Sequence, residues 1–411
     1  MARFIIQGGK RLSGRHTVPG NKNAALPMLA ACVLTDEPVR LENVPLIEDV
    51  RTMLELLTQL GVSVKVDGHT ITLCAAGLKT TSLDPDLCRR VRSSILFAGP
   101  MTARHGGVTV FSPGGDVIGR RRLDAHFAAL TSLGASIKYR RSAYAFRASR
   151  LRGADILLDE ASVTATENAV MAAVLASGRT TLFNAACEPH VQDLCLMLNR
   201  MGARILGAGT NFIQIEGVRR LRGVRQKIGP DYTDAMSFVA AAAVTRGELH
   251  LSNIPASVVS VIQRPFCKLG VHWSCRGNAL RLPGRQRFVV EDDVGAAIPK
   301  VEDGPWPSFP SDLMSIAIVL ASQAHGTMLF FEKMCNTCHQ TRKDRGILNG
   351  PNLDGIGSRV LARTGSEEAA RTWFRNHLRD PIAYPGPDHE NFMAKMPAVP
   401  MTEAECALLT E

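Results

Sequence analysis

Aromatic side chains and long apolar runs are both scarce in this chain of 411 residues, and each shortage excludes a class of protein. Aromatic residues make up 5% of the sequence, too few to stack the bases of single-stranded nucleic acid. No apolar run reaches the roughly 18 residues that a membrane helix needs. Residues 1–20 also lack the charged and apolar pattern of a secretion signal. We therefore expect a cytoplasmic protein with no membrane span and no nucleic-acid partner.

Dense basic runs are missing too, although the formal net charge is +10 at pH 7. The densest run, Arg120-Arg121-Arg122, stands beside a glycine-rich loop. A short basic run at such a loop suits a small anion better than a phosphate backbone. Hydrophobic residues amount to 45% and charged residues to 21%, which is typical of a folded chain rather than a disordered one.

Closely spaced cysteine pairs are nearly absent, which argues against a disulfide framework. Seven of the ten cysteines are isolated, and we interpret them as small buried side chains in a reducing compartment. These seven are Cys32, Cys74, Cys88, Cys187, Cys195, Cys267 and Cys275. Cys406 is a further single cysteine, to which we assign no role. Only Cys335 and Cys338 have a spacing that indicates a site.

A repeat runs through most of the chain. A leucine-rich segment that ends in glycine and precedes a β-type run occurs as LTQLGVSV, LTSLGASI, LNRMGARI and CKLGVHW. The glycines are Gly61, Gly134, Gly202 and Gly270, at spacings of 73, 68 and 68 residues. A glycine just past a leucine-periodic helix indicates a C-cap, because the left-handed conformation there suits glycine best.

A second marker alternates with the first. An apolar helix reaches a polar turn and then a β-type run, as in GGVTVFSPGG, GRTTLFNAA, GELHLSNIP and GTMLFFEKM. This alternation of helix and strand predicts an α/β architecture. The period also predicts a fifth glycine marker near position 338, where Cys338 stands instead. We therefore expect the repeat to be interrupted there.

Two polar stretches interrupt the apolar pattern near the start of the chain. PGNKNAALP, from 19 to 27, is a turn that opens a helix with Lys22 and Asn23 in its first positions. A cation there opposes the helix dipole, so an anionic ligand explains Lys22 better than local stability does; a solvated lysine is the alternative. PGGDVIGRRR, from 113 to 122, carries Asp116 between glycines and arginines. Such an acid is a candidate proton donor facing an anion, and a hairpin tip with solvated charges is the alternative.

A third stretch, FPSDL, places Asp312 at the start of a predicted helix. A capping role for Ser311 or Asp312 is an alternative to a functional one. Asp124 and His126 stand just after the second stretch.

These stretches resemble a known family when taken with RSSILFAGP, ASVTATEN, EPHVQDL and PDYTDAMSFVAAAA. Their order and spacing are similar to those of the UDP-N-acetylglucosamine 1-carboxyvinyltransferases, the enolpyruvyl transferases of peptidoglycan synthesis. The resemblance covers residues 1–334 and implies two inside-out α/β barrel domains of repeated βα units, with a ligand cleft between them. Residues 22–229 match the complete three-repeat domain. Residues 1–21 plus 230–334 match a second domain that holds only about one and a half repeats.

The resemblance implies a reaction and a set of anion contacts. The 3′-hydroxyl of the sugar adds to C2 of phosphoenolpyruvate, C3 is protonated, and phosphate leaves the tetrahedral adduct. By matching position, Lys22, Arg92 and Arg121 hold the phosphate and carboxylate charges. Ser162 and Val163, at a helix start, offer backbone N–H groups to the diphosphate.

The resemblance also assigns the remaining positions. Asn23 touches the sugar, and the segment that ends at Asp124 meets the uridine. Asp312 orients and deprotonates the attacking hydroxyl. Glu188 and Asp231 match family acids whose roles stay open. The transferase part needs no cofactor.

Asp116 departs from the commoner family pattern, in which a cysteine at this position donates the C3 proton. Some members carry aspartate, so the departure is compatible with activity. A carboxylic acid must have a raised pKa to stay protonated near neutral pH, whereas neighbouring arginines lower it. Loop closure that excludes water is expected to supply the difference. Aspartate also lacks the thiolate that fosfomycin alkylates, which predicts insensitivity to that drug.

The last part of the chain resembles a different family, the class I c-type cytochromes, over residues 328–411. CNTCH matches the haem attachment signal, in which Cys335 and Cys338 form thioethers and His339 is an axial iron ligand. GPNLDGIGSR and AKMPAVPMTEAE follow, and Met396 would be the sixth ligand, with Met393 and Met401 as substitutes. A small all-α cytochrome-like domain over 335–411 is therefore predicted, and its final helix looks clipped. A chance CxxC or a zinc knuckle is the alternative.

Three interpretations follow from these two resemblances. The chain is a transferase whose tail binds haem, an electron-transfer protein on a passive α/β scaffold, or a junction of two genes without a joint function. Covalent haem attachment occurs outside the cytoplasm, whereas the transferase substrates lie inside it. The two activities are therefore not expected in one molecule. Transferase ancestry is the leading interpretation, with UDP-N-acetylglucosamine and phosphoenolpyruvate as ligands; a redox partner is not indicated.

Overall fold

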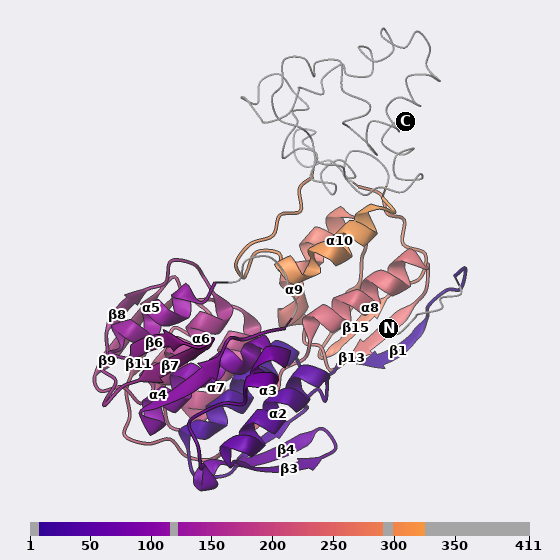
Figure 1. Ribbon diagram of the computed structural model, residues 1–411. Helices are drawn as coiled ribbons and strands as arrows, with labels where there is room; N and C mark the ends of the chain where they lie inside the picture. The colour runs from indigo at the N-terminus through magenta and orange to yellow at the C-terminus, as the bar shows by residue number, and fades with distance from the viewer. Residues whose placement is uncertain (1–7, 116–121, 291–298, 325–411) are drawn as a thin grey trace, which may run out of the picture.

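The computed structural model describes residues 8–115, 122–290 and 299–324 (Figure 1). Helices and strands alternate along these residues, as the repeat predicts, and two lobes lie side by side in Figure 1. Within the described residues, every helix is too short or too polar to span a bilayer. The interrupted marker near 338 and the whole cytochrome-like stretch lie outside the described residues.

Three small sheets form the outside of the first lobe. Their strand orders are β12-β2-β4-β3, β5-β7-β6 and β10-β11-β9-β8. The strands are β2 (Val39–Glu42), β3 (Ser63–Asp67), β4 (Thr70–Cys74), β5 (Gly107–Phe111), β6 (Ser136–Arg140), β7 (Ala143–Arg147), β8 (Asp155–Leu157), β9 (Arg179–Phe183), β10 (Arg204–Leu206), β11 (Phe212–Glu216) and β12 (Val224–Lys227).

The second lobe has one sheet of the same design, with the order β1-β13-β15-β14. Its strands are β1 (Gly14–Thr17), β13 (Leu249–Ser252), β14 (Ser274–Arg276) and β15 (Ala279–Leu282). Each four-stranded sheet has one parallel pair at an edge, namely β12 with β2, β8 with β9 and β1 with β13, and its other pairs are antiparallel. The repeat seen in the sequence is therefore a repeat of sheets.

Helices fill the space behind these sheets. In the first lobe they are α1 (Lys22–Ala31), α2 (Glu48–Leu60), α3 (Pro85–Arg90), α4 (Ala98–His105), α5 (Asp124–Ser132), α6 (Val163–Ala173) and α7 (Pro189–Arg200). In the second they are α8 (Tyr232–Val244), α9 (Ala256–Lys268) and α10 (Met314–Ala321). Short 3₁₀ turns are η1 (Cys32–Leu34), η2 (Ala75–Gly77), η3 (Arg92–Phe97) and η4 (Ser311–Leu313).

The glycine markers of the sequence lie where they were predicted. Each marker glycine lies one or two residues past the end of a helix. Gly61 follows α2, Gly134 follows α5, Gly202 follows α7 and Gly270 follows α9, with φ angles of 96°, 96°, 104° and 74°. Glycine reaches this left-handed region without a Cβ clash. The C-cap prediction is confirmed at all four positions.

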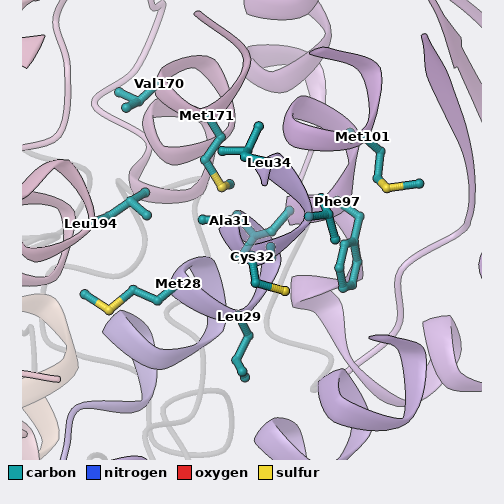
Figure 2. Packing of buried hydrophobic residues seen from close by; sticks show 14 of the residues in the cluster. Met28, Leu29, Ala31, Cys32, Leu34, Phe97, Met101, Val170, Met171 and Leu194 are labelled. Atoms are coloured by element: carbon teal, nitrogen blue, oxygen red, sulfur yellow. The ribbon is translucent and has the colours of Figure 1, made fainter. Parts of the chain in front are cut away.

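Helix α1 runs through the middle of the first lobe. All eight residues from Ala24 to Ala31 are buried, as expected of a helix with neighbours on every side. Figure 2 shows Met28 and Leu29 on this helix, with Leu194 of α7 and Met171 of α6 nearby. Buried helices inside and sheets outside give the inside-out arrangement that the resemblance implied.

Two hydrophobic clusters divide the described residues. One gathers side chains from Ala24 to Ile228, and the other joins Val18 to side chains between Tyr232 and Ala321. This separation supports the predicted division into 22–229 and 1–21 plus 230–334, and that division remains our proposal.

Candidate active site

Two chain crossings lie side by side where the lobes meet. β1 leads into α1, and β12 leads into α8. The Asn21 N–H donates to the Gly229 carbonyl at 2.8 Å, and the Asp231 N–H donates to the Pro19 carbonyl at 2.9 Å. This pairing holds the first turns of α1 and α8 next to each other.

Gly20 allows this close approach. A Cβ at Gly20 would lie 1.8 Å from the carbonyl oxygen of Asn43, which no side chain tolerates. The glycine of the PGNKN stretch is therefore explained by backbone packing at the crossing.

Asp231 connects the two crossings through its carboxyl group. Its Oδ1 accepts the N–H groups of Thr233 at 2.9 Å and Asp234 at 3.1 Å, which caps α8. The Lys22 N–H also hydrogen-bonds this carboxyl. Burial raises the pKa of Asp231, while these N–H groups act against the rise. The Asp231 side chain thus fixes the start of α1 as well as that of α8.

Lys22 and Asn23 occupy the first turn of α1, as predicted. Asn21 caps this helix, because its Oδ1 accepts the Asn23 N–H at 2.7 Å and the Ala24 N–H at 3.3 Å. Lys22 Nζ lies 3.1 Å from Asp49 Oδ2 of α2. Both side chains are about two-fifths exposed, at 42% and 38%, and such pairs contribute roughly 0–1 kcal/mol. An anionic ligand can therefore compete for the ammonium group.

Acidic side chains from both lobes face the crossing. Glu188, just before α7, accepts a hydrogen bond from the backbone N–H of Trp306 in the second lobe. Burial raises the pKa of Glu188, and the charge of Asp312 raises it further. Burial also raises the pKa of Tyr232, again with contributions from Asp312 and Glu188. Asp312, Glu188 and Asp231 therefore form one negatively charged region around Tyr232.

Asp312 and Ser311 do not act as helix caps. The 3₁₀ turn η4 and helix α10 both begin without a side-chain cap. Ser311 Oγ instead donates to Asp303 Oδ2 at 2.6 Å. The capping alternative for this stretch is wrong, and the functional role of Asp312 stays a prediction.

A second group of predicted residues lies along η3, α5 and α6. Arg92 begins η3, and its Nη2 donates to the Arg122 carbonyl at 3.5 Å. Arg122 and Asp124 form an ion pair at the start of α5. Gly114 packs closely against α3, since a Cβ at this position would lie 1.7 Å from the Arg89 carbonyl oxygen. The glycine-rich loop is thus held against the Arg92 segment at its first residues.

Ser162 and Val163 stand at the start of α6, as predicted. Ser162 is the N-cap residue, but its side chain makes no capping hydrogen bond, and no acidic residue lies in the first turn. Asn21, Asp84 and Asp231 do cap α1, α3 and α8. The positive end of the α6 dipole is therefore not neutralised by a capping side chain or by an acid in the first turn, and an anionic ligand can bind there.

Helix α1 links the two groups, because it packs against both η3 and α6. Asp116 and Arg121 lie outside the described residues, as do Cys335, Cys338, His339 and Met396. Within the described residues, no group of three or more His, Cys, Asp or Glu side chains could hold a metal ion.

Three further contributors were not predicted from the sequence. Trp306 acts through its backbone N–H, which any residue supplies. Glu167 is fully buried inside α6, and burial together with Glu188 raises its pKa well above the usual range. Asn168 makes its hydrogen bonds inside an apolar helix. A charged or amide residue within an apolar run was the only available hint for the last two.

Comparisons with known proteins agree with this arrangement. A family model described as EPSP synthase (3-phosphoshikimate 1-carboxyvinyltransferase) matches residues 6–342. The UDP-N-acetylglucosamine 1-carboxyvinyltransferase of Treponema denticola is 50% identical over 335 residues, 81% of this chain and 78% of that protein. The enzyme of the same name from Bradyrhizobium diazoefficiens is 48% identical over 333 residues, 81% and 77% of the two chains. The chain belongs to the UDP-N-acetylglucosamine 1-carboxyvinyltransferase family.

Solved structures show that the fold of this family member is that of enolpyruvyl transferases. The enolpyruvyl transferase NikO from Streptomyces tendae matches with a TM-score of 0.66 at 21% identity, covering 78% of this chain and 75% of that one. An EPSP synthase from Acinetobacter baumannii matches with a TM-score of 0.55 at 18% identity, covering 88% and 79%. The mixed α/β fold predicted for residues 1–334 is confirmed by these matches.

Proposed function

We propose that this enzyme transfers the enolpyruvyl group of phosphoenolpyruvate to the 3′-hydroxyl of UDP-N-acetylglucosamine and releases phosphate. The observation that carries the proposal is the 50% identity over 335 residues to a relative of that name. The paired crossings add support, because they place Lys22 beside acids from both lobes. Since both substrates are cytoplasmic metabolites, we propose the cytoplasm as the site of action.

The acidic region at the crossing fits the first half of the reaction. Asp312 takes the proton of the 3′-hydroxyl while the 3′-oxygen of the sugar forms its bond to C2 of phosphoenolpyruvate. Glu188 and Asp231 lie in the same acidic region around Tyr232 as Asp312. Asn23 holds the sugar, and Lys22 with Arg92 and Arg121 holds the phosphate and carboxylate groups.

The second half of the reaction needs a proton at C3 and a leaving phosphate. Asp116 donates the proton as the carbon–oxygen bond forms at C2. Return of a C3 proton to the Asp116 carboxylate, together with cleavage of the bond from C2 to the phosphate oxygen, then restores the double bond and releases phosphate. The first turn of α6, at Ser162 and Val163, holds the diphosphate of the acceptor, and Asp124 meets its uridine end.

The test is phosphate release from phosphoenolpyruvate by the purified full chain, with and without UDP-N-acetylglucosamine. We expect release only with the sugar nucleotide, and a loss of about 10²–10⁴-fold in Asp312→Asn, the range for general acid–base groups. Glu302→Gln is the matched control, since Glu302 lies on the same segment and pairs with Lys300 at the surface. A folded wild-type chain that releases no phosphate would refute the proposal.

For residues 335–411 the sequence supports a separate proposal. Covalent haem on Cys335 and Cys338, with His339 and Met396 as iron ligands, would make this part an electron-transfer module. Fusion to an export signal and co-expression with a haem attachment system test it. A Soret band that survives denaturation is expected, and apoprotein without bound haem would refute it.

A further inference from the structure

A buried network of polar side chains joins α5 and α6 to the backbone of η3 and of α4. His126 of α5 is 3% exposed, and Asn168 of α6 is fully buried. His126 Nδ1 lies 2.9 Å from Asn168 Nδ2, and His126 Nε2 lies 3.1 Å from Thr164 Oγ1. Asn168 also bonds the Ile95 carbonyl at 2.9 Å and the Gly99 N–H at 2.8 Å.

The two backbone partners fix the direction of every hydrogen bond in this network. The Gly99 N–H can only donate, so it faces Asn168 Oδ1, and the Ile95 carbonyl can only accept, so it faces Nδ2. The second hydrogen of Nδ2 then points to His126 Nδ1, which must be unprotonated. The ring hydrogen is therefore on Nε2, and His126 donates it to Thr164 Oγ1.

Thr164 stands at the place where this network meets the candidate site. It is the second residue of α6, directly after Val163, in a first turn that no side chain caps. Because its oxygen accepts the hydrogen of His126, its own hydroxyl hydrogen is directed to another acceptor. Arg92 contributes a positive charge near His126, so the surroundings of this turn favour an anion.

We propose that His126 is a positioning residue that, held by Asn168, orients the Thr164 hydroxyl and the first turn of α6 toward the diphosphate of the sugar nucleotide. Thr164 is then a binding residue that donates to a phosphate oxygen. This inference rests on the proposed function for the identity of the ligand. Burial and Arg92 lower the pKa of His126 to about 4, which keeps the donor arrangement unchanged across neutral pH.

Two substitutions of His126 separate the two sides of the ring. In His126→Gln the amide nitrogen reaches the position of Nε2 and preserves the donor to Thr164. In His126→Asn the amide oxygen reaches the position of Nδ1 and preserves only the contact with Asn168. Thr164→Val removes the hydroxyl while it keeps the shape and the branched Cβ.

The experiment measures binding of UDP-N-acetylglucosamine and of UDP to the full chain by calorimetry, so that it does not depend on turnover. We expect Thr164→Val and His126→Asn to weaken both ligands by about threefold to tenfold, the effect of one lost hydrogen bond. His126→Gln should recover most of the loss relative to His126→Asn. The KM of phosphoenolpyruvate should change much less than that of the sugar nucleotide.

Several outcomes decide the matter. Unchanged affinity in folded Thr164→Val and His126→Asn, or equal loss in His126→Gln and His126→Asn, overturns the inference. Wild-type protein that binds the sugar nucleotide but releases no phosphate refutes the proposed function alone, and the variants still test the network. Wild-type protein that does not bind the nucleotide overturns both.

Discussion

At the scale of single residues, we propose that the proton donor of this enzyme is a different functional group from that of its commoner relatives. Asp116 offers a carboxyl oxygen where a thiol is the more frequent proton donor. A carboxylate does not open the epoxide of fosfomycin under the conditions in which a low-pKa thiolate does. We expect phosphate release to survive stoichiometric treatment with the drug. Asp116→Cys is the matched variant, in which inactivation should appear; loss of wild-type activity would contradict the prediction.

His190 supplies a second test at this scale. It is buried with 4% of its surface exposed, both ring nitrogens lack a hydrogen-bond partner among the described residues, and burial lowers its pKa to about 4. Below the ordinary pKa of 6.5, the unfolded chain binds a proton that the folded chain does not. The stability that neutral His190 contributes is therefore complete above pH 6.5 and is lost as the pH falls toward 4.

His190→Leu carries no such proton. We expect the free energy of unfolding of the variant, relative to the wild type, to rise by about 1.4 kcal/mol for each pH unit below the unfolded pKa. Over the whole window the gain approaches about 3 kcal/mol. Urea denaturation of both proteins across this pH range measures the difference. A difference that does not vary with pH would show that His190 is not held neutral.

At the scale of elements, the Asn21 cap both stabilises α1 and fixes the position of Lys22, the residue that follows it. Asn21→Ala removes the acceptor for two N–H groups and should cost about 1 kcal/mol. Because Lys22 follows directly, we also expect the KM of phosphoenolpyruvate to rise. Asp84→Ala removes the cap of α3, which carries no predicted site residue, and is the control with a similar stability cost. Equal KM values in the two variants would disconnect the cap from the site.

Elements that depend on local signals could be predicted from the sequence. The glycine after each leucine-periodic helix, the helix that opens at Lys22 and the alternation of helix and strand all follow from short-range conformational preferences. The His126–Asn168 contact spans 42 residues, and its direction depends on backbone groups of a third segment. Such a network forms only when three helical segments pack together, so it could not be predicted from a local sequence pattern. The capping alternative at Ser311 was wrong for the same reason, because the Ser311 hydroxyl donates its hydrogen bond to the Asp303 carboxylate.

At the scale of the whole molecule, the two lobes repeat one design in different surroundings. α1 and α8 each follow a crossing and a capping residue, so Met28 and Phe238 occupy matching positions seven residues after Asn21 and Asp231. Met28 is fully buried, near Met171 of α6 and Leu194 of α7 (Figure 2). Phe238 is 41% exposed and stacks on His16 at 4.1 Å between ring centroids. Among the described residues alone, the helical position is fully covered in the first lobe and partly exposed in the second.

This difference predicts unequal costs for equivalent substitutions. Met28→Ala should destabilise the protein by about 2–5 kcal/mol, as buried large-to-small changes do. Phe238→Ala should cost less than about 2 kcal/mol, because the ring is partly exposed before the change. Denaturant unfolding of both variants checks the order. A greater cost for Phe238→Ala would mean that its ring is covered in solution.

The pairing of β1 with β13 has a consequence for synthesis on the ribosome. Gly14 lies opposite Leu249, so β1 emerges 235 residues before its partner. At typical rates of about 5–20 residues per second, β1 waits roughly 10–50 s for that partner. The first lobe is complete in sequence before β13 appears, and it can fold during this wait. The N-terminal strand is thus the earliest part of the second lobe to be made and is among the last to be paired.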